Sequence, residues 1–439
     1  MKPLLLVIDD DPTGIQTVHG VRVCMTWSRE VVANLFQNDH LAFIQTNNRA
    51  RPETDAARIC QEIVGHAVDI SRRTGRPFSV ISRGDSTLRG HYPAEPEAIR
   101  QTLDAAGLPV DGEILCFFLA EAGRITKNNI HYICQPDGTL TPVSDTEFAH
   151  DAVFGYYSAD LTQYVAEKTG GRVRASDVRT LPLDWLESGQ IDRCIAQLTG
   201  LQHGTPLIVN ATAQRHVEVA VEAIRRAEQQ GKRFVFRTAA AFVKVYGGIP
   251  DRPFLTRAEL QPYLTDGPLL TVVGSHTEHT NRQLSELLKE PRTAAIEVDV
   301  AALLADREAT LRRVSQAVEN ALGSNQEPVV FTSRQVRKAD SHEASLAISR
   351  RIATALSQVV CSLPRRPRAV IAKGGITSSE VVTTGLGIEA GLVLGQVLPS
   401  IPVIISGAAS QFGELPVIIF PGNTGQTDDL RTCWRLLSR

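Results

Sequence analysis

Short apolar runs alternate with longer amphipathic stretches along most of this chain of 439 residues. The short runs have the length of buried strands and lie at 4–8, 41–44, 78–81, 114–119, 207–209, 269–273, 329–332, 369–372, 403–405 and 417–420. Apolar positions three and four residues apart are typical of amphipathic helices and occur at 55–71, 96–106, 216–230, 280–288, 306–322, 344–363 and 379–384. This alternation predicts an α/β fold with mainly parallel sheets.

A stretch rich in glycine and proline separates two halves of this pattern. Residues 248–268 contain three prolines before Gly267 and Pro268, and they show no strong apolar period. Such clusters mark loops and domain boundaries. We therefore predict one domain at 1–247, a linker or crossing segment at 248–268 and a second domain at 269–439. We expect the two α/β domains to face an interdomain cleft.

Composition and charge exclude several classes of protein. The chain has 46 Lys and Arg against 48 Asp and Glu, and this near-neutral balance argues against a general nucleic-acid binder. No run of 18 apolar residues could span a membrane. The first apolar run is short and ends in three aspartates, unlike a secretory signal, so we expect a cytoplasmic protein. The seven cysteines lack CxxC spacing and indicate neither a zinc site nor a disulfide framework, and we assign no metal ligand.

Polar clusters follow the apolar runs of the first half. The candidates at these strand ends are Asp9, Asp10, Asp11, Arg49, Arg83, Asp85, Arg89, Glu121 and Arg124. In open α/β sheets the ligand lies beyond the carboxyl ends of the strands. Arginine captures carboxylates or phosphates with two hydrogen bonds, and aspartate binds a hydroxyl or accepts its proton. The set indicates a small, polyhydroxylated, anionic substrate; the alternative is that these side chains are solvated or paired with each other.

Glycine-rich turns follow three apolar runs of the second half. They are Gly274-Ser275, Lys373-Gly374-Gly375-Ile376-Thr377 and Pro421-Gly422. At least two open a helix, whose free N–H groups and dipole attract phosphate, and glycine lets the backbone approach closely. Thr377 and Glu380 have the spacing of a capping box, which predicts a helix start at Thr377. Three such turns predict a nucleotide site, although the glycines could merely form turns; no GxxxxGK[ST] motif occurs.

Together these motifs resemble the four-carbon acid sugar kinase family nearly from end to end. The similar segments of the first half are Asp10-Asp11-Pro12-Thr13-Gly14, Asn48-Arg49, residues 85–90, residues 121–124 and residues 146–151. Those of the second half are Gly274-Ser275, residues 374–377 and Gly422-Asn423-Thr424-Gly425. The chain departs from the family at Arg83, where lysine is frequent, and at Phe420-Pro421-Gly422, where a Lys-Ser-Gly turn is frequent.

The resemblance implies an ATP-dependent kinase, with ATP and Mg²⁺ as cofactors. It would phosphorylate the terminal hydroxyl of threonate, erythronate, a 3-oxo-tetronate or a branched relative such as 3-oxo-isoapionate. The implied substrate site comprises Asp10, Asp11, Arg49, Arg83, Gly84, Asp85, Ser86 and Arg89, and Asp10, Asp11 or Asp85 would orient and deprotonate the hydroxyl. The implied ATP contacts are Ser275, Gly374, Gly375, Ile376, Thr377 and Gly422. The oligomeric state is not fixed by the sequence, and a homodimer stays open.

Two other functions remain as alternatives. An NAD-dependent hydroxy-acid dehydrogenase would require GxGxxG after a strand, whereas Gly385-Leu386-Gly387 follows an expected helix. A non-catalytic two-domain sensor would close on a sugar acid without consuming ATP. Consumption of ATP in the presence of candidate acids distinguishes the kinase from the sensor.

Overall fold

The chain forms two compact units in a computed structural model that describes residues 2–135, 137–334, 342–422 and 424–438, with only the backbone of 342–347. The first unit comprises Met1–Gly14 and Thr26–Asp251, and the second comprises Ile15–Met25 and Arg252–Arg439. The division is therefore not a single cut in the sequence, because a short segment near the N-terminus belongs to the second unit.

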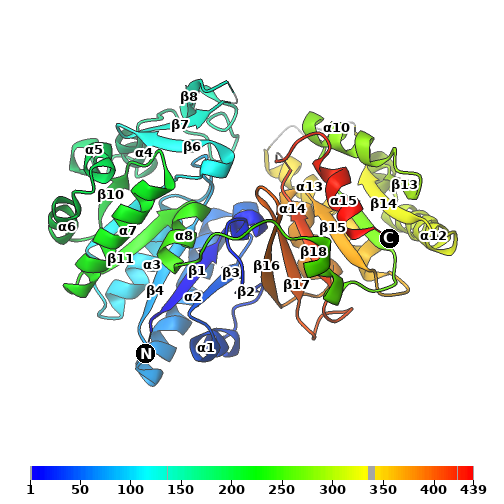
Figure 1. Ribbon diagram of the computed structural model, residues 1–439, viewed down its shortest axis with the longest axis horizontal. Helices are drawn as coiled ribbons and strands as arrows, with labels where there is room; N and C mark the ends of the chain where they lie inside the picture. Colours follow the sequence, from blue (N-terminus) through cyan, green and yellow to red (C-terminus); the bar gives the residue numbers. More distant parts are fainter. Residues whose placement is uncertain (1, 136, 335–341, 423, 439) are drawn as a thin grey trace. The chain divides into compact units, whose positions relative to one another are not determined.

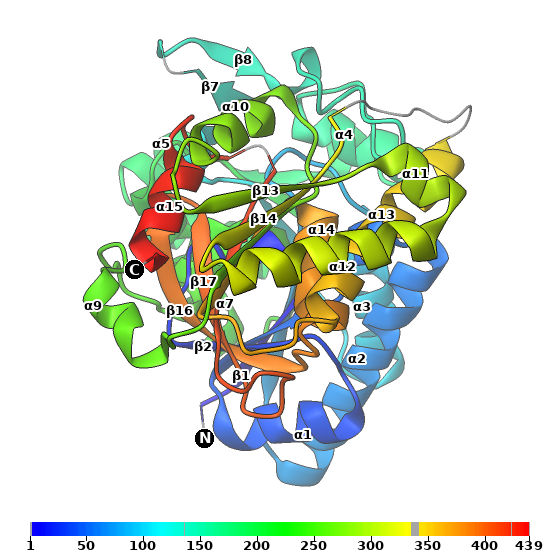
Figure 2. The same ribbon diagram turned by 90° about the vertical axis from the view of Figure 1, so that its right-hand side faces the viewer.

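The first unit is built on a parallel sheet covered by helices on both faces. Its strands, in spatial order, are β3 (Leu41–Gln45), β1 (Leu4–Asp9), β4 (Phe78–Arg83), β11 (Phe234–Thr238), β5 (Gly112–Cys116), β10 (Thr205–Val209) and β9 (Arg179–Leu181). One face carries α2 (Glu53–Thr74) and α3 (Ala94–Ala105), and the other carries α7 (Gln214–Gln229) and α8 (Ala240–Gly247) (Figures 1 and 2). The central strands read as continuous apolar runs because both faces are buried.

The chain changes direction across this sheet at β1. It leaves β1 for β3 on one side and then passes from β3 to β4 on the other side. Loops at such a switch point diverge and leave a crevice beyond the carboxyl ends of the strands. The register places Asp9, at the end of β1, beside Arg83, at the end of β4. The topology therefore brings two of the predicted polar clusters together.

Smaller elements complete the first unit. They are α1 (Arg29–Asn38), α4 (Leu161–Lys168), α5 (Leu183–Glu187), α6 (Ile191–Thr199) and an antiparallel sheet of β6 (Arg124–Lys127), β7 (Ile130–Cys134) and β8 (Leu140–Pro142). The strand expected at 114–119 ends at Cys116. Leu119 instead exchanges backbone hydrogen bonds with Arg124 across a tight turn, because the chain reverses there into β6.

The sheet of the second unit is parallel on one side and antiparallel on the other. Its order is β13 (Thr293–Val298), β14 (Glu327–Thr332), β12 (Leu269–Val273), β15 (Ala369–Lys373), β18 (Pro416–Phe420), β17 (Ile401–Ser406), β16 (Ala390–Leu398) and β2 (Val21–Cys24). The first five strands run parallel, and β17, β16 and β2 pair antiparallel. The prediction of α/β domains with mainly parallel sheets is confirmed.

Helices cover both faces of this second sheet as well. One face carries α10 (Glu278–Leu287) and α15 (Asp429–Leu437); the other carries α12 (Arg307–Gly323), α13 (His342–Cys361) and α14 (Gly375–Glu380), with α11 (Val300–Ala305) beside α12 (Figure 2). A switch point lies between β12 and β15, because the chain leaves β12 for β13 and later passes from β14 to β15. The predicted glycine turns that follow β12 and β15 both lie at this switch point.

Residues 252–268 are more ordered than a linker. They contain α9 (Arg257–Leu260) and the 3-10 helix Gln261–Tyr263. Leu255 and Leu260 are buried in the same apolar cluster as Trp434 of α15. The prolines and glycines that hid an apolar period therefore shape a segment that packs on the second unit.

No helix in the described ranges is long and apolar enough to cross a membrane. All seven cysteines lie in those ranges as free thiols.

Candidate functional site

Three consecutive aspartates occupy the carboxyl end of β1. Asp9 and Asp10 are buried, whereas Asp11 is partly exposed. Asp11 accepts hydrogen bonds from the backbone N–H of Thr13 at 2.8 Å and from its hydroxyl at 2.5 Å, which fixes the turn after the strand. A Cβ atom on Gly14 would overlap the carboxylate of Asp9. The segment from Asp10 to Gly14 therefore folds back onto the carboxylate of Asp9.

Three arginines from three other elements surround Asp10. Arg49 follows β3 and contacts Asp10 at 2.6 Å, while Arg83 of β4 and Arg237 of β11 lie 3.7 and 3.6 Å from it. Arg49 also reaches Asp11 at 3.3 Å. These residues therefore pair with one another, as the alternative interpretation expects, and Asp10 is the centre of that pairing.

Arg237 is a member of this group that the sequence did not predict. Its side chain is 2% exposed and donates hydrogen bonds to Glu95 at 2.7 Å and to the Ser82 hydroxyl at 2.8 Å. Cβ atoms on Gly84 and Gly90 would both overlap its guanidinium group. The glycines on either side of the Asp85 loop thus leave room for a buried arginine.

Strand β11 supplies this arginine, and the sequence signal for it is weak. Only three apolar residues, Phe234 to Phe236, precede Arg237. The buried charge interrupts the apolar pattern, so periodicity does not reveal the strand. Glu95 was missed for a related reason, since it lies in the first turn of α3, before the predicted helix start at residue 96.

Asp85 forms a second polar group beyond β4. Its carboxylate accepts hydrogen bonds from Arg89 at 2.7 Å and from the Thr87 hydroxyl at 2.5 Å. Arg89 also lies 3.8 Å from Asp151, in the segment whose motif resembled the family. Its guanidinium carbon is 4.8 Å from the centre of the Phe148 ring. Arg89, from the predicted cluster after β4, therefore contacts two residues of the segment 146–151.

The loop that carries Asp85 is held by its backbone carbonyls. His131 contacts the carbonyl of Ser86 at 2.7 Å, and the hydroxyls of Tyr156 and Tyr164 donate to the carbonyls of residues 87 and 88 at 2.9 Å each. Leu88 has a φ of +68°, a conformation that a leucine rarely adopts without such support. Ser86 is itself buried, and its carbonyl is part of this scaffold.

Burial and neighbouring charges separate the pKa values of these carboxylates. Burial raises the pKa of Asp9 to about 7, with Asp10 and Asp11 adding to the rise and Arg83 opposing it. Burial also disfavours the charged form of Asp85, but Arg89, Arg49 and Thr87 outweigh it and lower the pKa of Asp85. Asp85 is therefore an anion throughout the physiological range.

In the second unit the predicted turns converge at the carboxyl ends of β12, β15 and β18. The backbone N–H of Gly274 donates to the backbone carbonyl of Lys373 at 3.1 Å, and that of Gly374 donates to the backbone carbonyl of Phe420 at 2.9 Å. A Cβ atom on Gly274 would overlap the Thr377 hydroxyl. The Thr377 side chain thus occupies the space beside Gly274, and the turns approach each other closely because their glycines carry no side chain.

Ser275 and Gly422 close the same junction. Cβ atoms on Gly374 and on Gly422 would lie 3.2 Å from the Ser275 nitrogen and 3.4 Å from its Oγ. The Ser275 and Thr280 hydroxyls are 2.9 Å apart, and Thr280 donates to the Gly422 carbonyl at 3.1 Å. The predicted cofactor residues therefore lie together, except Asn423 of the family-like turn, which is outside the described residues.

The helix after β15 begins earlier than the sequence predicted. Gly374 is its N-cap, with a φ of +113°, and Thr377 lies inside α14. The predicted capping box at Thr377 is therefore wrong, and Glu380 instead accepts a hydrogen bond from Thr384 at 3.1 Å. The reason is the positive φ, which lets the chain turn directly from the strand into the helix at the glycine pair.

Lys373 lies fully buried beneath this junction. Its Nζ donates to the Pro421 carbonyl at 3.0 Å and lies 3.9 Å from the centre of the Phe420 ring. Burial lowers its pKa to about 7, although Cys433 and Asp429 act in the opposite direction. Lys373 therefore supports the turn that carries Gly422 through its hydrogen bond to the Pro421 carbonyl.

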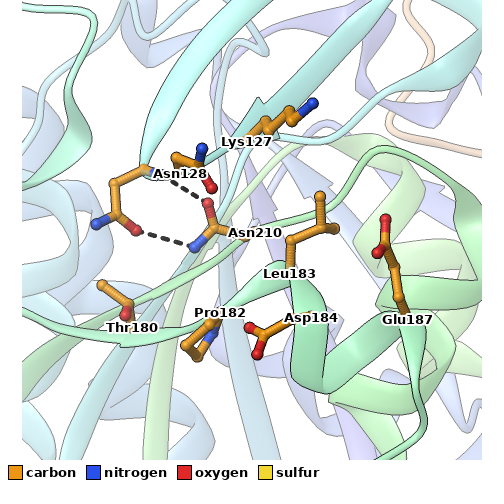
Figure 3. A pocket seen from close by; sticks show the side chains of 9 residues that line it. Lys127, Asn128, Thr180, Pro182, Leu183, Asp184, Glu187 and Asn210 are labelled. Carbon is orange, nitrogen blue, oxygen red and sulfur yellow. Dashed lines mark hydrogen bonds between the residues drawn. The ribbon is translucent and has the colours of Figure 1, made fainter.

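Two cavities lie away from both groups of predicted residues. One, of about 610 Å³, lies near the ends of β9 and β10, with Lys127, Asp184 and Glu187 on its walls (Figure 3). Asn129 and Asn210 close its side through hydrogen bonds of 2.7 and 2.9 Å. The other, of about 280 Å³, lies at the opposite, amino ends of the second sheet, beside Arg368. Neither contains a residue predicted for substrate or nucleotide.

Comparison with known proteins agrees with this arrangement. The chain matches a sugar-binding N-terminal domain over residues 5–246 and a nucleotide-binding C-terminal domain over residues 270–430. It is 25% identical to a protein named D-threonate kinase from Salmonella typhimurium, over 97% of this chain and 96% of that protein.

Two solved structures share the fold. One is from Salmonella typhimurium LT2, with a TM-score of 0.71, 17% identity and 99% of each chain covered. The other is a Haemophilus influenzae protein of the DUF1537 family, with a TM-score of 0.65, 17% identity, and 99% of this chain and 100% of that chain covered. With the two domain matches spanning most of its length, the chain belongs to the four-carbon acid sugar kinase family.

Proposed function

We propose that this protein is an ATP-dependent kinase that phosphorylates the terminal hydroxyl of a four-carbon sugar acid or of its 3-oxo derivative. The observation that carries the proposal is the cluster of aspartates and arginines at the switch point of the first unit. Such a cluster offers both acceptors for hydroxyl groups and donors for a carboxylate. The relative named D-threonate kinase supports the same chemistry.

In this proposal Asp85 orients the hydroxyl that attacks the phosphoryl group. Its pKa is lowered, so it is always ready to accept a hydrogen bond but is a weak base. Phosphoryl transfer passes through a loose transition state in which positioning contributes more than early proton removal. Asp10 and Asp11 would hold Arg49 in place beside it, since both contact its guanidinium group. The remaining members of the proposed substrate site are Arg83, Gly84, Ser86 and Arg89.

The glycine turns of the second unit would hold ATP, which supplies the phosphoryl group. We expect its phosphates to contact Ser275, Gly374, Gly375, Ile376, Thr377 and Gly422; in support, Cβ atoms added to Gly374 and Gly422 would lie only 3.2 and 3.4 Å from atoms of Ser275. No cluster of three or more histidine, cysteine or acidic side chains that could hold a metal occurs among the residues with described positions. We therefore expect Mg²⁺ to be bound mainly by the phosphates and by water.

A coupled assay of ADP release over a panel of acids tests the proposal. The panel contains both stereoisomers of threonate and of erythronate, 3-oxo-tetronates and 3-oxo-isoapionate, each with ATP and Mg²⁺. We expect saturable, acid-dependent ADP release with at least one of them. Binding of an acid without ADP release would favour the sensor, and a change in NADH absorbance with a hydroxy acid would favour the dehydrogenase.

Asp85→Asn tests the role of the second polar group. We expect kcat to fall about 100-fold or more, because the amide keeps the shape but no longer attracts the hydroxyl proton. The affinity for ATP, measured by calorimetry, should not change. Asp145→Asn, at an exposed position of the same unit, is the matched control and should keep full turnover. Near-normal turnover in the Asp85 variant would remove this residue from the mechanism.

A further inference from the structure

Arg124 differs from the other arginines around the aspartates. Arg49, Arg83, Arg89 and Arg237 each lie within 4.0 Å of at least one carboxylate oxygen. Arg124 has no such partner among the residues that the structure describes. Its Nη1 donates to the carbonyl of Ala122, and its Nε is buried without a hydrogen-bond partner. A buried donor of this kind costs free energy unless a ligand satisfies it.

The backbone holds Arg124 firmly at the start of β6. Its N–H donates to the carbonyl of Leu119 at 2.9 Å and its carbonyl accepts from the same residue at 3.0 Å. Gly123, with a φ of +68°, makes the tight turn that allows this bridge. The side chain therefore starts from a fixed position, as a binding residue requires.

Arg124 lies beside the residues proposed to orient the substrate hydroxyl. Its guanidinium carbon is 5.7 Å from the centre of the Phe148 ring, and that of Arg89 is 4.8 Å from the same ring. Because Arg89 already contacts Asp85, the shared ring places Arg124 next to this pair. Burial, together with the repulsion from Arg89, lowers the pKa of Arg124, and Asp85 opposes this. Asp85 thus compensates the charge of Arg124 only in part.

We propose that Arg124 binds the carboxylate of the sugar acid and so sets the preference for acids over neutral polyols. This rests on the proposed kinase function. Each of the other four arginines already contacts a carboxylate of the protein, whereas Arg124 contacts none in the described ranges and its Nε has no hydrogen-bond partner. A planar guanidinium group can bind a carboxylate with two parallel hydrogen bonds. The four-carbon chain would then extend from Arg124 toward Asp85.

The experiment compares Arg124→Gln with Arg124→Lys and with two reference variants. Arg49→Gln removes an arginine that is already paired, and Lys127→Gln removes a charge from an exposed side chain of the same strand, β6. For each protein, kcat and KM are measured with the best acid of the panel and with the corresponding four-carbon polyol. Binding of the acid alone is measured by calorimetry, and binding of ATP confirms that the fold is intact.

We expect Arg124→Gln to raise KM and the dissociation constant for the acid roughly 10- to 100-fold, because a charged, bidentate contact is lost. The KM for the polyol and the dissociation constant for ATP should not change. Arg124→Lys should keep part of the affinity for the acid that Arg124→Gln loses. Lys127→Gln should behave as wild type. The proposal is overturned if the acid and the polyol are affected equally, or if Arg49→Gln alone loses the discrimination. Absence of ADP release in the wild-type protein would instead overturn the kinase function itself.

Discussion

Lys373 illustrates how a single buried charge shapes the behaviour of this protein. It lies at the end of β15, fully buried, with one carbonyl acceptor at 3.0 Å and an aromatic ring beneath it. Burial lowers its pKa from an ordinary value of 10.5 to about 7, while Cys433 and Asp429 oppose the change. Between these two values the unfolded chain binds a proton that the folded chain does not. Stability should therefore rise with pH in this window.

Substitution Lys373→Met should abolish this dependence. From pH 7 to pH 9 we expect the free energy of unfolding of the wild-type protein to increase by about 2 kcal/mol relative to that of the variant. The comparison of slopes is robust, because the unpaired Pro421 carbonyl in the variant costs the same at each pH. Urea unfolding at pH 7, 8 and 9 measures the difference. Parallel curves for the two proteins would show that Lys373 stays charged when folded.

At the scale of single elements, the strands that the sequence predicts well are continuous apolar runs followed directly by polar or glycine residues. β1, β12 and β15 are each buried on both faces and are followed by a polar or glycine-rich turn, so their ends and the candidate residues could be inferred. β11 carries Arg237 inside the sheet, and β2 has only four residues with Arg22 among them. In both, a charged residue within the strand breaks the local apolar pattern. The partner of Asp10 on β11 was therefore not predictable from periodicity.

The loop after β4 depends on an element far along the chain. Tyr164 of α4 donates a 2.9 Å hydrogen bond to the carbonyl of Leu88, which has a φ of +68°. We expect Tyr164→Phe to cost about 1 kcal/mol of stability and to lower kcat/KM for the sugar acid several-fold, because the loop with Asp85 loses its anchor. The affinity for ATP should stay the same.

Kinetics and thermal unfolding of Tyr164→Phe and Tyr132→Phe check this expectation. Tyr132 lies on β7 in the same unit, and its hydroxyl makes no hydrogen bond to the described residues, so its loss should have little effect. If both substitutions lower kcat/KM equally, the loop does not depend on the Tyr164 hydroxyl.

At the scale of the whole molecule, the path of the chain makes the second unit depend on residues near the N-terminus. β2 belongs to that unit and pairs antiparallel with β16, with Val23 opposite Gly391. Val23 is fully buried. A linear division at residues 248–268 could not predict this, because the run Val21–Cys24 is too short to be assigned to a sheet before its partner is known.

Substitution Val23→Ala should therefore weaken the second unit, although residue 23 lies within the range that matches the sugar-binding domain. We expect a loss on the order of 2 kcal/mol from the buried methyl groups and faster amide exchange in β16. The matched control is Val7→Ala in β1, equally buried, which should instead speed exchange in β4, its neighbour in the first unit. Hydrogen-exchange mass spectrometry resolves the two patterns. Unchanged exchange in β16 after Val23→Ala would mean that β2 does not support the second unit, since a cavity loosens the strands that line it first.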